Sequence, residues 1–231
     1  SVTDENNNFY EVGFSSESER VRKRTKVNGN QIAKASEFYS RLLTVFYGPE
    51  DNSLINGTHE TRRKYIDSVI AKTSSEYIRL LNDFRKILTS RNALLKEIRE
   101  NRKKDSELDI WDSLFSDRAS KIMEKRRAAM EFFSVHFRSS YERISEMNEI
   151  PDIRYLPNMQ EYDSRAIAGK IERGRKKDIA FGSSLQGPHR DRYCFMKKDM
   201  EISSYGSQGQ IRIAAIALKS AERKLVEEVK D

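Results

Sequence analysis

The residues best suited to chemistry form one short stretch near the end of the chain, Tyr205-Gly206-Ser207-Gln208-Gly209-Gln210. Ser207 and Gln210 have the spacing of a capping box, in which both side chains satisfy backbone groups of a helix's first turn. The two glycines leave the backbone bare, which lets a ligand approach closely. A helix N-terminus of this kind attracts phosphate through its N–H groups and dipole. The stretch therefore predicts either a phosphate contact or simply a well-capped helix.

The neighbouring pattern predicts the elements that position this stretch. Apolar residues recur at helical spacing from Ile211 onward, which favours an amphipathic helix. Upstream, Gly187-Pro188-His189-Arg190-Asp191 precedes an apolar run from Tyr193 to Met196, a Lys-Lys-Asp turn and a second run from Met200 to Ile202. This order predicts a strand, a turn, a second strand and then the helix.

Two long helices are predicted in the middle of the chain, over about 74–104 and 107–147. Their apolar residues follow near-heptad stripes, so we expect an antiparallel hairpin with the stripes facing each other. Thr58 is expected to cap an earlier helix that carries Arg62-Arg63-Lys64. Beyond the hairpin, 151–157 reads as a strand, and a helix over 161–173 leads into a basic run that ends at Lys177.

Residues 1–47 read as β-rich. Alternating residues predict strands over 9–15 and 22–27, and Asn28-Gly29 is a strong hairpin signal. A short helix over 36–43 and a buried strand over 43–46 are expected to follow.

Composition narrows the class of protein. Lys and Arg outnumber Asp and Glu by 43 to 36, giving a net charge of +7 and a pI near 9.3. This basicity is compatible with nucleic acid or an anionic membrane as a partner. We expect no membrane span, because the sequence has no sufficiently long apolar run, and no metal site, because His59 and His136 lack partners at ligand spacing. The single cysteine, Cys194, excludes an internal disulfide and fits a cytoplasmic location.

Six motifs in register resemble the RecF family of ABC-type, SMC-like ATPases. They are Gly48-Pro49-Glu50-Asp51 with Gly57, Arg62 to Asp67, Ser90 to Lys96, Trp111-Asp112, Gly187 to Asp191 and Tyr205 to Gln210. The resemblance implies a mixed α/β (α+β) fold. Residues 1–57 would form a β-rich part of an ATPase head, 58–150 an inserted helical arm, and 151–231 a return to the head with the signature helix.

The resemblance also implies roles for particular residues. In this family the signature helix of one head acts in trans on the nucleotide held by the other. Ser207, Gly209 and Gln210 would be the catalytic signature residues, and Ser207, Gln208, Gly209, His189 and Arg190 would contact the nucleotide. Arg190 could instead hold the head through a carboxylate, and its neighbour Arg192 stands where the family usually has a second acid. For DNA the expected contacts are Arg62, Arg63, Lys64, Arg173, Arg175, Lys176 and Lys177.

The resemblance implies a function for the whole protein rather than for this chain alone. The sequence contains neither a G-x-x-x-x-G-K-[ST] phosphate loop nor an apolar strand ending in two acids, so we expect the central part of a longer protein. That protein would be a slow DNA-dependent ATPase that uses ATP and Mg²⁺, dimerises with ATP and binds double-stranded or gapped DNA. It would work with RecR and RecO to load recombinase during replication, recombination, repair and the SOS response, in the nucleoid-associated cytoplasm.

The sequence is also compatible with two other hypotheses for the function of the chain. One is a non-enzymatic helical module that binds DNA or protein without nucleotide. The other is an SMC-type head with coiled-coil stubs, which would need longer heptad tracts than those found here.

Overall fold

A computed structural model of the chain describes residues 1–3, 7–17, 20–32, 45–145 and 150–228. It divides into two units, Ser1–Val45 and Phe46–Asp231, and each is considered by itself. The described residues contain no helix that is both long and apolar enough to cross a membrane.

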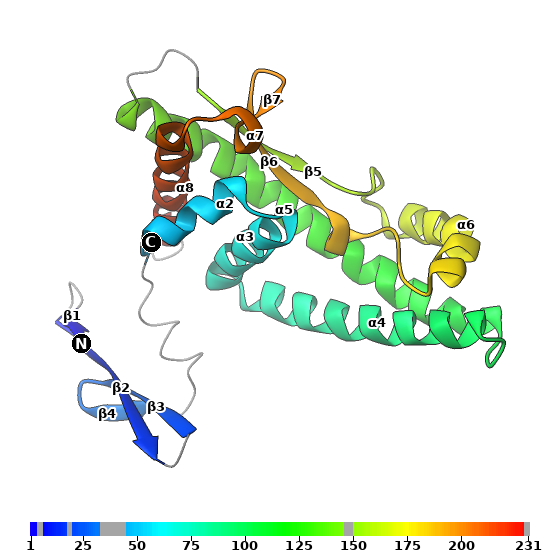
Figure 1. Ribbon diagram of the computed structural model, residues 1–231. Coiled ribbons are helices and arrows are strands. Elements are labelled where there is room, and N and C mark those ends of the chain that lie inside the picture. The colour runs from blue at the N-terminus through cyan, green and yellow to red at the C-terminus, as the bar shows by residue number, and fades with distance from the viewer. Residues whose placement is uncertain (4–6, 18–19, 33–44, 146–149, 229–231) are drawn as a thin grey trace. The chain divides into compact units, whose positions relative to one another are not determined.

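The first unit is an antiparallel sheet of four strands, in the order β1 (Val2–Thr3), β2 (Phe9–Glu17), β3 (Arg20–Val27) and β4 (Asn30–Ile32) (Figure 1). Asn28 and Gly29 both take left-handed φ angles, 50° and 80°, as a two-residue hairpin turn requires. The predicted strands and hairpin are therefore confirmed.

The predictions for residues 36–46 fall mostly outside the described residues. The predicted helix over 36–43 lies entirely there, as do residues 43 and 44 of the predicted buried strand. Val45 and Phe46 are described, and neither belongs to a strand. Phe46 is 72% exposed, so this part of the buried-strand prediction is wrong.

The second unit is mostly helical, with one small antiparallel sheet in the order β5-β6-β7 (Figure 1). Its elements are η1 (Pro49–Asn52), α2 (Ser53–Asn56), α3 (His59–Thr73), α4 (Ser75–Arg99), η2 (Asp105–Glu107), α5 (Leu108–Ile144), β5 (Asp152–Leu156), α6 (Ser164–Phe181), η3 (Pro188–Arg190), β6 (Arg192–Lys197), β7 (Met200–Glu201), α7 (Ile202–Tyr205) and α8 (Gln208–Glu228).

Helices α4 and α5 form the predicted antiparallel hairpin. The rings of Phe84 and Phe115 lie 5.0 Å apart between centroids, and Lys125 pairs with Glu76 at 3.0 Å. Each pair joins the two helices, and residue numbers that rise along one helix fall along the other. Helix α4 ends at Arg99, five residues before the predicted end, and Asn101 beyond it takes a left-handed φ of 58°.

Helix α5 is the centre of the second unit. It contacts α4 and α6, and it also contacts α8 and β5 (Figure 1). The ring of Phe137, near its C-terminal end, lies 5.6 Å from that of Phe195 in β6, and Ser134 donates a hydrogen bond to the carbonyl of Ile153 in β5. One continuous helix therefore joins the hairpin to the elements that carry the signature stretch.

Helix α6 corrects one element boundary. The sequence places the basic run after a helix that ends near 173, but α6 continues through that run to Phe181. Asp163 caps its start by accepting a hydrogen bond from Ala166 N at 2.9 Å, and Gly182 ends it with a left-handed φ of 63°. Gly174 is accommodated within the helix instead of ending it.

The predicted mixed α/β class is confirmed, because the chain is mostly helical with two small antiparallel sheets. The further assignment of these parts to an ABC-type head and an inserted arm stays a prediction, as do the boundaries at 57 and 150.

Candidate functional site

The capping box at the start of α8 is present. Gln210 N donates to Ser207 Oγ at 3.2 Å, and Ser207 N donates to Gln210 Oε1 at 2.9 Å. Ser207, Gln208 and Gly209 are exposed. The N–H groups of Gln208 and Gly209 have no acceptor among the described residues, as expected in the first turn of a helix. Two N–H groups and one hydroxyl are therefore presented together at a positive helix end.

Of the two glycines in this stretch, the fold requires Gly206 but not Gly209. A Cβ at Gly206 would lie 2.5 Å from the carbonyl oxygen of Ile202, so the local backbone excludes any other residue there. A Cβ at Gly209 would meet nothing closer than Ser207 Oγ at 3.8 Å, and its φ is not left-handed. Glycine inside a helix costs roughly 0.5–1 kcal/mol relative to alanine. Packing within the described residues therefore does not explain why position 209 is glycine.

The helix behind the capping box is firmly held. Ile211, Ala214 and Ala215 are buried on one face of α8, and Ala217 and Leu218 continue that face. Glu222, farther along, is 1% exposed and accepts hydrogen bonds from Tyr65 and Lys72 of α3. The N-terminus of α8 is therefore presented by a rigid element.

The motif from Gly187 to Asp191 forms η3 and leads into β6. Gly187 takes a left-handed φ of 130°, and a Cβ on it would lie 2.5 Å from the Phe115 ring. His189 Nε2–H donates to the carbonyl of Ser184 at 3.0 Å, and burial lowers the pKa of His189 to about 4, so the ring is neutral at pH 7. Arg190 donates to the same carbonyl at 3.2 Å and is exposed.

Asp191 pairs with Arg126 of α5 and not with its neighbour Arg190. Arg126 Nη1 lies 2.7 Å from Asp191 Oδ2, and Arg126 also binds both carboxylate oxygens of Asp67, at 3.0 and 2.9 Å. Tyr155 OH and Asn158 N complete the shell of Asp191, at 2.6 and 2.8 Å. Asp191 is fully buried, so this network fixes the start of β6 to α3 and α5.

The structure does not bring His189 and Arg190 to the signature residues. They precede β6, whereas Ser207 follows β7 and α7 at the other end of that strand (Figure 1). Six strand residues span about 20 Å. Both residues therefore fall outside the site formed by the capping box.

Arg62 is buried, at 3% exposure, and its guanidinium is engaged within the protein. It donates to the carbonyls of Tyr193 and Ile55, at 2.7 and 2.6 Å, and pairs with Glu201. This location corrects its assignment to the DNA surface, because the whole guanidinium, including its unpartnered Nε, is buried away from solvent. Arg63 is half-buried and donates to the carbonyl of Asp191 at 2.7 Å, whereas Lys64 is exposed and pairs with Glu60.

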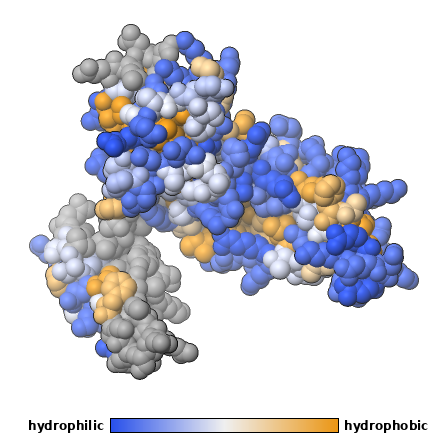
Figure 2. Space-filling model, in the orientation of Figure 1, coloured by the Kyte–Doolittle hydropathy of each residue, from blue (hydrophilic) through white to orange (hydrophobic). Residues whose placement is uncertain are grey.

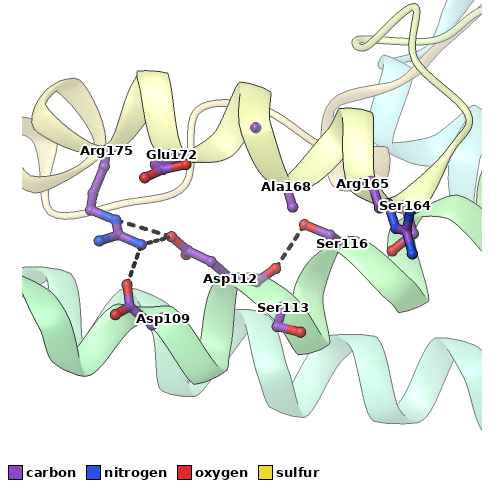
Figure 3. Close-up of a pocket in the computed structure, with 10 residues that line it drawn as sticks. Asp109, Asp112, Ser113, Ser116, Ser164, Arg165, Ala168, Glu172 and Arg175 are labelled. Carbon is purple, nitrogen blue, oxygen red and sulfur yellow. Dashed lines mark hydrogen bonds and ion pairs between the residues drawn. The ribbon is translucent and has the colours of Figure 1, made fainter.

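The basic residues of α6 also differ in whether their side chains are exposed or engaged within the protein. Arg173, Lys176 and Lys177 are exposed. Arg175 points toward α5, where its Nη2 lies 2.7 Å from Asp112 and 2.8 Å from Asp109 (Figure 3). Its pKa is raised by these two carboxylates despite partial burial. Arg175 therefore joins two helices and is not available to DNA.

Arg91, like Arg126, is a buried arginine whose ion pairs were not predicted from the sequence. It is 0% exposed, and it binds Asp112 of α5 at 2.7 Å and Asp178 of α6 at 2.8 Å. Its Nη1 also donates to Ser184 Oγ at 2.7 Å. Arg91 and Arg126 both occupy positions on the apolar stripes of their helices, and a charged residue on such a stripe is a readable signal of a buried ion pair.

The visible surface is largely hydrophilic, with separate apolar patches (Figure 2). Beside the capping box, Tyr205 and Met200 are 74% and 52% exposed. No group of three or more His, Cys, Asp or Glu side chains arranged to hold a metal occurs among the described residues.

Comparison with known proteins shows which proteins the chain is similar to. No family model matches the chain. The chain is 32% identical over 203 residues to the DNA replication and repair protein RecF of Lachnoclostridium phytofermentans, with 88% of this chain and 56% of that protein covered. It is 32% identical over 233 residues to the same-named protein of Thermoanaerobacter sp. strain X514, with 97% and 63% covered.

Comparison with solved structures leads to the same family as comparison of sequences. A solved structure of the recombination mediator protein RecF-ATPrS in the RecFOR pathway matches 95% of this chain with a TM-score of 0.81 at 30% identity. The chain is a homologue of RecF. A second RecF structure, with ATP, matches 96% of the chain with a TM-score of 0.82 at 29% identity. The chain spans about 60% of the length of the RecF proteins it matches.

Proposed function

We propose that this chain supplies the signature half of a composite ATP site in a RecF-type DNA replication and repair protein. In this proposal Ser207 Oγ and the N–H groups of Gln208 and Gly209 donate to the γ-phosphate of an ATP bound to a second subunit, with Gln210 holding the turn. The ATP and its Mg²⁺ are held by the other subunit's phosphate loop. The observation that carries the proposal is Gly209, whose missing side chain the fold does not require.

The physical chemistry suits this task. Preorganised donors at a helix N-terminus stabilise negative charge without having to move when the charge arrives. Binding across two subunits makes dimerisation depend on ATP, because the nucleotide supplies contacts to both. The RecF structures with bound ATP and ATPrS support ATP as the nucleotide.

DNA binding is proposed for the outer face of α6. Arg173, Lys176 and Lys177 are exposed and occupy positions i, i+3 and i+4, so they lie on one face of the helix. Lys64 is exposed on α3 and is retained as a weaker candidate. Cooperation with RecR and RecO in loading recombinase at gaps, the SOS role and the cytoplasmic location follow from the RecF relationship and are part of the same proposal.

The proposal is tested by comparing Ser207→Arg with Ser207→Ala in a protein that joins this segment to a phosphate loop. The alanine variant loses the cap, which costs about 1 kcal/mol of folding free energy. The arginine variant additionally fills the place proposed for the γ-phosphate. We expect Ser207→Arg to abolish ATP-dependent dimerisation, measured by light scattering, while nucleotide still binds the phosphate loop.

The helical-module reading gives a different expectation. If α8 is merely a capped helix, both variants lose similar stability, and neither substitution changes how the protein associates in the presence of ATP. That result would overturn the proposed function.

A further inference from the structure

A groove of about 330 Å³ lies between α3, α4, α5 and η3, separate from the signature stretch. Its size is at the lower end of the range for ligand pockets, about 300–1,000 Å³. The network around Arg126 forms part of its wall, so the walls are held by buried ion pairs.

The floor of the groove is apolar. Leu81, Phe84 and Leu88 lie at positions i, i+3 and i+7 along α4 and therefore share one face of that helix. Ile122 of α5 lies beside them. Leu88 is half-buried and leaves part of its side chain open, which gives the groove a surface for one apolar group.

The rim of the groove carries surplus positive charge. Two of its cations are neutralised, because Lys64 pairs with Glu60 at 2.6 Å and Arg126 pairs with Asp67 at 2.9 Å. Arg63 and Arg85 have no carboxylate partner among the described residues. Arg63 is held in place by its hydrogen bond to the Asp191 carbonyl, and Arg85 is exposed.

The surroundings of Arg63 favour an anion. The pKa of Arg63 is lowered, first by burial and then by the positive charge of Arg126, and these two causes outweigh the opposite effect of Glu60, Asp191 and Asp67. Both causes mean that its charge is stabilised less well than it would be in water. A carboxylate bound beside Arg63 would offset them, and arginine and carboxylate can form two parallel hydrogen bonds.

We propose that this groove binds an acidic peptide segment of a partner protein. An apolar side chain of the peptide contacts Leu88, and its carboxylates pair with Arg63 and Arg85. The apolar floor decides between a peptide and a nucleic acid, since a phosphate backbone would use the two arginines and leave Leu88 without a role. Recognition of acidic motifs by arginine clusters follows the same chemistry.

The test begins with a random peptide display library selected on the 231-residue chain. The enriched peptides should combine Asp or Glu with a large apolar residue. A labelled peptide of this kind is then titrated with three variants by fluorescence anisotropy. Arg85→Glu and Leu88→Asn should each weaken binding about tenfold or more, equivalent to at least about 1.4 kcal/mol. Lys86→Glu is the matched control, because Lys86 is exposed on the same helix and does not line the groove.

Two results would overturn the proposal. The first is enrichment of peptides that lack acidic residues, or that bind all three variants like the unmodified chain. The second is a loss of labelled duplex DNA binding in Arg85→Glu with peptide binding unchanged, which would assign the arginines to phosphate. Arg85 is exposed, so its variant should keep the far-UV circular dichroism of the unmodified chain.

Discussion

At the scale of single residues, Gly209 separates function from stability. Alanine fits at this position without a clash and is the better helix former. We therefore predict that Gly209→Ala raises the free energy of unfolding by roughly 0.5–1 kcal/mol, yet loses ATP-dependent dimerisation. Denaturation and light scattering measure the two effects separately.

Gly206→Ala is the control for that prediction. Its new Cβ would collide with the Ile202 carbonyl, so it should destabilise the protein. If Gly209→Ala dimerises with ATP as the unmodified protein does, the backbone at 209 does not approach a nucleotide closely.

Residue type and spacing predicted the capping box, but they did not predict which basic residues are exposed. Successive helical residues are rotated by about 100°, so three consecutive cations cannot all lie on the same face. Arg62, Arg63 and Lys64 accordingly lie buried, half-buried and exposed. Once a run is known to be helical, the same rule separates Arg175 from the other cations of α6.

At the scale of elements, the Arg126 network should hold the start of β6 in place. Removing Arg126 leaves Asp67 and Asp191 buried without their cation, which typically costs 3–5 kcal/mol. We predict that Arg126→Met loses about this much unfolding free energy at pH 7. Arg190→Ala, a nearby exposed arginine, should change it by less than about 0.5 kcal/mol.

The pH dependence of this loss gives a further check. Burial raises the pKa of Asp191, and the charge of Arg126 opposes that rise. Without Arg126 the folded-state pKa of Asp191 rises further above its unfolded value. The folded variant then binds more protons than the unfolded chain does, so its deficit should shrink as the pH falls below 7. A deficit that stays constant or grows with acidity would mean that lost packing, and not buried charge, explains it.

The outer face of α6 gives the second prediction at this scale. Each phosphate contact on duplex DNA contributes about 0.9 to the slope of log affinity against log salt. Changing Arg173, Lys176 and Lys177 together to Ala should flatten that slope, as measured by anisotropy with a labelled duplex. A charge-matched triple change of Arg79, Lys86 and Lys96, which are exposed on α4, serves as the control.

If both triple variants flatten the slope equally, DNA binding responds to the net charge of the protein and not to α6.

The sequence predicted the type of most elements, because hydrophobic periodicity and capping residues are local signals. It did not predict how far α6 extends, because Gly174 and a dense basic run resemble a loop until tertiary packing on α5 stabilises the helix.

At the scale of the whole molecule, the sequence motifs alone indicated the resemblance to RecF. They did not show that α5 joins the hairpin and the signature elements in one helix, because long-range contacts leave no periodic signal. Nor did they separate His189 and Arg190 from Ser207, since residues close in sequence can lie at opposite ends of a strand.

The central claim is that Ser207 acts on a nucleotide held by another subunit, and mixing two inactive proteins tests it most directly. One protein carries Ser207→Arg with an intact phosphate loop, and the other carries an intact signature with its phosphate-loop lysine replaced. Each alone should fail to hydrolyse ATP. A mixed dimer contains one complete composite site, so activity should reappear on mixing, in proportion to how often unlike chains pair. If the mixture stays inactive while both proteins are folded and shown to pair, or if Ser207→Arg alone hydrolyses ATP normally, the trans role of Ser207 is contradicted.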